Sequence, residues 1–103
     1  MNYFKVVESP YSIKGYVITG TDPFYDYFGW QEGSFHVLQA RIMGLNYASY
    51  LRMGRDLYGG QIEGKNHFYP TLHFKEEKSA LKLANELNRR LNFLIEREKN
   101  TKN

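Results

Sequence analysis

The chain has 103 residues, of which 42% are hydrophobic, and it carries a formal net charge of +3. This length is that of a single domain, and the hydrophobic content excludes an intrinsically disordered chain. Cysteine is absent, which excludes disulfides and zinc–thiolate sites. No apolar stretch predicts a membrane span or a secretory signal, so we expect a cytoplasmic protein without a membrane partner.

Two β-strands are predicted first, over residues 3–8 and 12–19. Both runs are rich in Tyr, Val and Ile, and a Ser-Pro turn between them predicts a hairpin. Within the second run, Gly15 is expected to mark a bulge. A loop bounded by Gly20 and Gly33 follows.

A helical hairpin is predicted next. Ser34 is a suitable N-cap for a short helix over residues 35–43, and Gly44 ends this helix. Asn46 can cap a second helix over residues 47–58, which a pair of glycines closes. The sequence therefore predicts two helices inserted between strands.

A second β-hairpin and a long helix complete the chain. The hairpin spans residues 61–74 and turns at 64–66, and Pro70 places its strand at an edge or a bulge because proline cannot donate to the ladder. Residues 76–98 are expected to form the helix and 100–103 to fray. The apolar stripe of this helix, spaced by four, three, four and three residues, consists of Ala80, Ala84, Leu87, Leu91 and Leu94.

These elements predict one α+β domain over residues 1–99. Its sheet is small and mostly antiparallel, with three to four strands in two β-hairpins. The short helical hairpin is inserted between the β-hairpins, and the long C-terminal helix packs on one face of the sheet.

Residues 20–36 combine six aromatic rings with a negative charge. Asp22, Asp26 and Glu32 give this segment a local charge of −3, and because the whole chain carries +3, the remainder carries +6. Proteins that bind single-stranded nucleic acid alternate stacking rings with Lys and Arg. The carboxylates therefore argue against base stacking in this segment.

The rings of this segment admit two interpretations. In the first, they belong to the core, with the phenylalanines packed over the sheet and the tyrosines at its edge. In the second, some of them stay exposed, since Tyr and Trp are favoured at the centres of protein interfaces. The rings that this second interpretation assigns to a partner are Tyr25, Tyr27 and Trp30.

Phe93 falls outside the apolar stripe of the C-terminal helix. At 100° per residue it lies opposite the leucines, beside Glu86 and Arg89. Either a loop or the N-terminal strand covers it, or it is an exposed apolar spot between Arg89 and Arg97 that suits a partner's surface. Glu86 and Arg90 are spaced to form an ion pair on the same side of the helix.

The stretch QARIMGLNYASYLRM, residues 39–53, resembles the helix-turn-helix motif of DNA-binding proteins. Gly44 would stand at the turn of the motif. The resemblance implies that Asn46, Tyr47 and Arg52 face the major groove. The residues that this alternative assigns to nucleic acid are Arg41, Asn46, Arg52, Arg55, Arg89 and Arg90.

Two features oppose this resemblance. Gln39 occupies a position that the motif usually fills with an apolar residue. The apolar face of the second helix also includes residues that the motif would point at DNA, and packing of this face onto a sheet explains the pattern better. The face consists of Tyr47, Tyr50, Leu51, Gly54, Leu57 and Tyr58.

Catalytic and metal-binding patterns are weak. His67 and His73 lie about 20 Å apart along an extended strand, too far to share one ion, and each is expected to be half-exposed. His36 with the nearby carboxylates matches no motif that has a mechanism. We therefore expect no enzyme, no metal, no cofactor and no small-molecule substrate.

The sequence thus favours a non-catalytic module that binds a protein with a basic surface. A phage or mobile-element accessory protein that modulates host machinery fits the small size and the many lysines, asparagines and tyrosines, which indicate an AT-rich genome. The alternative is a DNA- or RNA-binding module. The residues expected to contact a protein partner are Asp22, Tyr25, Asp26, Tyr27, Trp30, Glu32 and Phe93.

Overall fold

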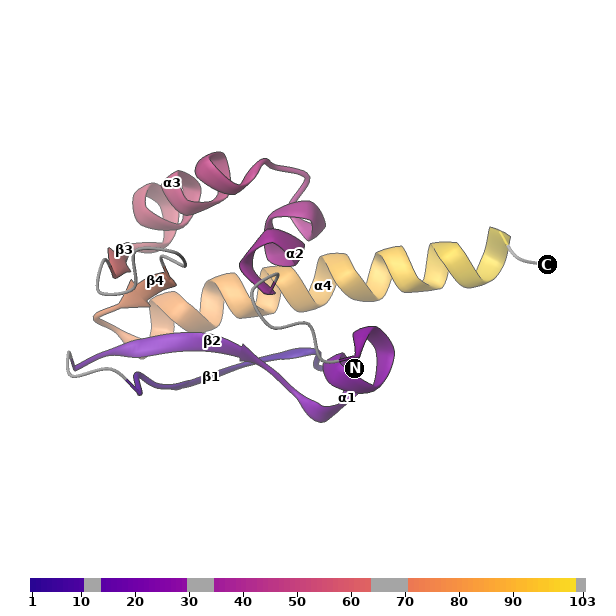
Figure 1. The fold of residues 1–103 in the computed structure, drawn as a ribbon, viewed down its shortest axis with the longest axis horizontal. Coiled ribbons are helices and arrows are strands. Elements are labelled where there is room, and N and C mark those ends of the chain that lie inside the picture. Colours follow the sequence, from indigo (N-terminus) through magenta and orange to yellow (C-terminus); the bar gives the residue numbers. More distant parts are fainter. Residues whose placement is uncertain (11–13, 30–34, 64–70, 102–103) are drawn as a thin grey trace.

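Three short helices stand between two β-hairpins, and a long helix follows the second hairpin, so the predicted α+β fold is confirmed. The computed structural model describes residues 1–10, 14–29, 35–63 and 71–101 (Figure 1). The elements in chain order are β1 (Phe4–Glu8), β2 (Tyr16–Gly20), α1 (Asp22–Phe28), α2 (Phe35–Ile42), α3 (Tyr47–Tyr58), β3 (Gly60–Glu63), β4 (Thr71–Phe74) and α4 (Glu77–Thr101).

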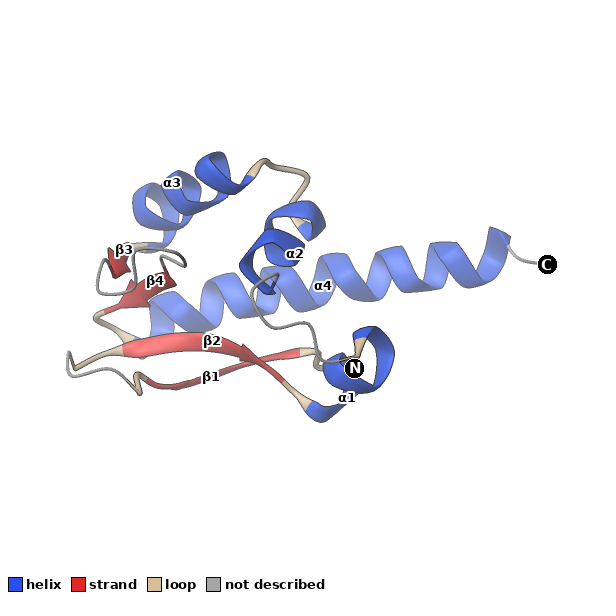
Figure 2. Ribbon diagram, viewed as in Figure 1, coloured by secondary structure: helices blue, strands red, loops and turns tan. Residues whose placement is uncertain are grey.

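The strands form one antiparallel sheet in the order β1-β2-β4-β3. β1 and β2 pair from Phe4 opposite Gly20 to Glu8 opposite Tyr16. Tyr16 also lies opposite Phe74 of β4, and this pair joins the two hairpins. The helices α3 and α4 lie on the same side of the sheet, where they cover its apolar face, and α2 packs against both of these helices (Figure 2).

The core lies between this sheet face and α4. Alternation along the strands turns one set of side chains toward α4. The buried members of this set are Phe4, Ile18, Leu72 and Phe74. The residues of α4 that they meet are buried at a helical spacing. These residues are Ala80, Leu83, Ala84, Leu87, Leu91 and Ile95.

The predicted stripe of α4 is wrong at Leu94. This side chain is 41% exposed, whereas Ile95 is buried. Ile95 follows Leu91 by four residues, and at 3.6 residues per turn this spacing keeps it over the core while Leu94 turns toward the edge. The helix also continues to Thr101 and so includes residues for which the sequence predicts fraying.

The limits of α3 are those predicted from its caps. The Asn46 side chain accepts a hydrogen bond from the Ser49 backbone N–H at 2.8 Å, and Gly59 ends the helix in the left-handed conformation, with φ 75°. The helix approaches β4 closely at Gly54, where an added Cβ would lie 2.4 Å from Leu72 Cδ1. Glycine permits this contact because it has no side chain.

The apolar face predicted for α3 does pack toward the sheet. Tyr50, Leu51 and Gly54 are buried, while Tyr47 and Tyr58 are half-buried against the core. Leu57 is the exception, since it is 71% exposed. It therefore does not belong to the packed face, and the sequence prediction is wrong at this position.

Residues 22–28 form the helix α1, although the sequence predicts a loop there. Pro23 stands in the first turn, where its fixed φ suits a helix and its missing N–H costs no hydrogen bond. Phe24 and Phe28, four residues apart, put two rings on one side of the helix. Gly29 ends it with φ 73°, and its N–H donates to the Tyr25 carbonyl.

His73 is buried rather than half-exposed as predicted, with 2% of its surface exposed. It lies beside Gly15, which precedes β2, and an added Cβ on Gly15 would lie 2.2 Å from His73 Nε2. The same nitrogen donates to the Lys14 carbonyl at 3.1 Å. The predictions for Pro70, His67, the turn at 64–66 and the Ser34 cap lie outside the described residues.

Candidate functional site

The α1 helix has an apolar inner side and an acidic outer side. Phe24 is 3% exposed and centres a cluster of rings, 5.2 Å from Phe4 and 5.0 Å from Phe28. Asp22 and Asp26 lie on the opposite side and are exposed. Neither carboxylate forms an ion pair within the part of the chain that the structure describes. The outer surface of α1 therefore carries two negative charges.

The phenylalanines of the aromatic segment pack in or against the core, as the first interpretation expects, whereas Tyr27 is 45% exposed. Phe28 and Phe35 are half-buried against the core cluster, and Phe35 lies 5.1 Å from Phe24 in an edge-on arrangement. Tyr25 also packs edge-on against Phe24, at 5.2 Å. Trp30 and Glu32, which were predicted to contact a partner, lie outside the described residues.

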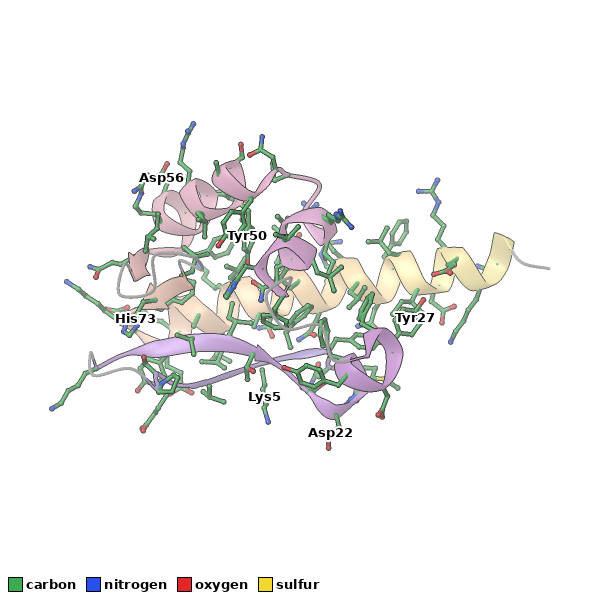
Figure 3. All side chains as sticks on the ribbon, in the orientation of Figure 1. Lys5, Asp22, Tyr27, Tyr50, Asp56 and His73 are labelled. Atoms are coloured by element: carbon green, nitrogen blue, oxygen red, sulfur yellow. The ribbon has the colours of Figure 1, made fainter. Side chains whose placement is uncertain are left out.

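Tyr27 connects α1 to α4. Its hydroxyl donates to Glu98 Oε2 at 2.8 Å, and its ring lies 4.8 Å from that of Phe28. Figure 3 shows Tyr27 turned toward α4, whereas Asp22 points away from the body of the protein. Tyr27 remains 45% exposed.

A hollow of about 210 Å³ opens between α1, α2 and the C-terminal half of α4. Tyr27 and Leu94 stand on its walls, and both are partly exposed. Arg41 and Glu98 add charge to its lining. The remaining lining is apolar and consists of Phe28, Leu38, Ile42, Leu91 and Ile95. We call this feature the α1–α4 hollow.

Phe93 is exposed, so neither a loop nor the N-terminal strand covers it. It is 63% exposed, and it follows Arg89 by four residues on α4. Its neighbour Leu94 enters the α1–α4 hollow, whereas Phe93 is not part of that lining. The structure thus brings Tyr27 and Leu94 together and leaves Phe93 on the adjoining side of α4. Leu94 is a site residue that the sequence assigned to the core.

The residues of the nucleic-acid alternative divide into arginines that are exposed and residues whose side chains are bound within the protein. Arg41, Arg52 and Arg55 are exposed on α2 and α3. Asn46 is held at the cap of α3, so its side chain is already engaged. The predicted Glu86–Arg90 ion pair is confirmed, at 2.7 Å, and Arg89 also binds Glu86, at 2.6 Å.

Among the residues that the structure describes, no three His, Asp or Glu side chains lie close enough to hold a metal ion. His36 packs edge-on against Phe35 at 5.6 Å, and burial lowers its pKa, so the ring is neutral at pH 7. His36 has therefore no charge to offer an anionic ligand at that pH.

None of the described helices combines the length and the apolar character that a bilayer span requires. Comparison of the chain with protein-family models, with curated proteins and with solved structures finds no match.

Proposed function

We propose that this protein is a non-catalytic binding module whose partner is another protein. The observation that carries the proposal is the α1–α4 hollow, where Tyr27 and Leu94 expose apolar surface above an apolar floor. Interface hot spots are often aromatic or apolar side chains that fit a pocket and lose contact with water on binding. A partner's apolar side chain can enter the hollow between these two residues.

The charge of α1 defines the kind of partner. Asp22 and Asp26 carry no compensating cation among the described residues, and they lie on the helix that supplies Tyr27. Such a surface steers a positively charged partner toward the hollow and repels an acidic one. The partner surface is therefore basic, with an apolar centre.

The same proposal includes the source of the protein and its compartment. The many lysines, asparagines and tyrosines, which indicate an AT-rich genome, fit a phage or mobile-element accessory protein that modulates host machinery. The absence of cysteine fits the cytoplasm as its compartment.

Capture from a lysate of the natural host tests the proposal, with the bound proteins identified and the complex rebuilt from purified components. Leu94→Asp is expected to weaken the rebuilt complex by about tenfold or more, because a carboxylate replaces an apolar contact. Leu81→Asp is a matched control, since Leu81 is also an α4 leucine that is 41% exposed. Circular dichroism establishes that both variants fold.

Two outcomes would overturn the proposal. In the first, Leu94→Asp and Leu81→Asp bind the rebuilt partner as tightly as the wild type does. In the second, every captured protein is lost after nuclease treatment, which would make nucleic acid the direct ligand.

Nucleic-acid binding is the second candidate, and the exposure of Arg41, Arg52 and Arg55 favours it. Three phosphate contacts would lower the affinity for a DNA duplex by roughly 40-fold between 50 and 200 mM salt, because the logarithmic slope is about −0.9 per contact. Weak duplex binding that is independent of salt would exclude this candidate.

A further inference from the structure

A second and larger hollow, of about 460 Å³, lies along α3. It is separate from the α1–α4 hollow, since the two share no lining residue. Met43 and Leu45, which follow α2, contribute apolar side chains, and Met53 and Leu57 of α3 continue this apolar surface. We call this feature the α3 hollow.

Leu57 exposes apolar surface in the α3 hollow. It is 71% exposed, whereas the described apolar side chains of the core are below a tenth. Leu45 and Met53 are half-buried, so part of each remains accessible beside it. Met53 is unbranched and polarisable, and such a side chain adapts to the shape of an inserted apolar group.

The charged lining of the α3 hollow is mainly positive. Arg52 is exposed and forms no ion pair or hydrogen bond within the described part of the chain. Arg90 uses Nε on Glu86 and Nη1 on the Met43 carbonyl, and this second bond fixes the guanidinium beside the hollow. Asp56 is the acidic residue of the lining, and its nearest cation is Arg55, at 3.9 Å.

We propose that the α3 hollow binds an amphipathic helical segment of a second protein, with acidic residues beside its apolar face. An apolar groove along a helix suits a ligand helix that inserts side chains at i, i+3 or i+4, and i+7. The part of α3 that lines the hollow, from Ser49 to Leu57, extends for about 12 Å, which matches about two turns of such a ligand. Carboxylates on the ligand would pair with Arg52 and Arg90.

The apolar lining favours a protein ligand over nucleic acid. Met53 and Leu57 offer no hydrogen bond to a phosphate, and Asp56 repels one. The outer surface of α1 is negative, whereas the charged lining of the α3 hollow is mainly positive. One chain can hold a basic partner at α1 and an acidic segment at α3, and so bridge two proteins.

Selection from a displayed library of random peptides of about 16 residues tests this proposal, since that length allows roughly four helical turns. Peptides that bind the full-length wild type are counter-selected against Leu57→Asp, which places a carboxylate in the hollow. The enriched sequences are expected to carry apolar residues at helical spacing and a net negative charge. A representative peptide should bind Arg52→Glu and Leu57→Asp at least about tenfold more weakly.

Arg41→Glu and Leu94→Asp are the matched controls, because Arg41, like Arg52, is an exposed arginine and both Arg41 and Leu94 line the other hollow. Both are expected to bind the peptide as the wild type does. The proposal is overturned if no peptide distinguishes the wild type from a folded Leu57→Asp variant, or if the enriched peptides are basic. It is also overturned if a labelled DNA duplex binds tightly, depends on Arg52 and ignores Leu57→Asp.

Discussion

Asn88 of α4 binds the backbone of Phe4 in both directions. Its Oδ1 accepts the Phe4 N–H at 2.8 Å, and its Nδ2 donates to the Phe4 carbonyl at 3.1 Å. The same Oδ1 also accepts the Tyr3 N–H at 2.8 Å. Asn88 is 8% exposed, so water cannot readily replace its side chain as the hydrogen-bond partner of these backbone groups. One buried amide thus fixes the first strand to the last helix.

Asn88→Ala is expected to destabilise the protein by about 2–3 kcal/mol, because it leaves buried backbone groups of β1 without a partner. Urea unfolding followed by circular dichroism measures the loss. Asn85→Ala is the matched control, since Asn85 is exposed on the same helix and should change stability by less than about 0.5 kcal/mol. Equal effects of the two variants would show that the Asn88 hydrogen bonds contribute nothing.

Gly54→Ala is expected to destabilise the protein by about 1–3 kcal/mol, although alanine is the better helix former. The reason is the 2.4 Å distance that its Cβ would have to Leu72 Cδ1. Thermal unfolding measures the change. Adding Leu72→Ala should remove the conflict, so the double variant should lose less stability than the sum of the single variants. Strict additivity would contradict the close approach of α3 and β4.

Gln39 and Tyr50 form a buried polar pair, in which the Tyr50 hydroxyl donates to Gln39 Oε1. Burial raises the pKa of this hydroxyl above its ordinary value of 10, so it remains a donor. Tyr50→Phe should cost about 1–2 kcal/mol, since it leaves Gln39 buried without this bond. Adding Gln39→Leu should recover part of the loss in chemical denaturation. A further loss in the double variant would contradict this pairing.

Stability at acid pH should depend on Glu86. Hydrogen bonds from Arg89 and Arg90 lower the pKa of this carboxyl from 4.5 to about 2. A carboxyl whose pKa is lowered by folding stabilises the folded protein at pH values above its pKa in the unfolded chain. This contribution is lost as the pH falls from 4.5 through about 2. Because the pair is partly exposed, the contribution is about 0.5 kcal/mol.

Unfolding of the wild type and of Glu86→Gln, compared between pH 2 and pH 6 in low salt, isolates this effect. The two free energies of unfolding should differ at pH 6 and converge as the pH approaches 2. A difference that stays constant over this range would assign it to packing rather than to the charge of Glu86.

The sequence predicts well those elements whose limits are set by residues within or next to the element. α3 begins at the Asn46 cap and ends at Gly59, and both signals are local to the helix. The stripe of α4 is equally local until its last turns, where the choice between Leu94 and Ile95 depends on which side the core occupies. Sequence spacing alone does not contain that information.

α1 shows why the rest could not be predicted. A helix of seven residues is unstable alone, and here the rings of Phe4 and Phe35 stabilise it through Phe24. These contacts come from distant parts of the chain. The two hollows are equally invisible in the sequence, because each is formed by residues of separate elements whose relative positions only the fold determines.

The contact between Asn88 and Phe4 spans 84 residues, and this separation governs when β1 can fold in the cell. At 5–20 residues per second, a ribosome adds Asn88 roughly 4–17 seconds after Phe4. Until Asn88 is added, β1 lacks these hydrogen bonds and has only β2 as a strand partner, and a two-stranded hairpin alone is only marginally stable. The apolar face that α4 later covers is exposed throughout synthesis. Efficient production of this protein therefore depends on keeping that hairpin from associating with other nascent chains.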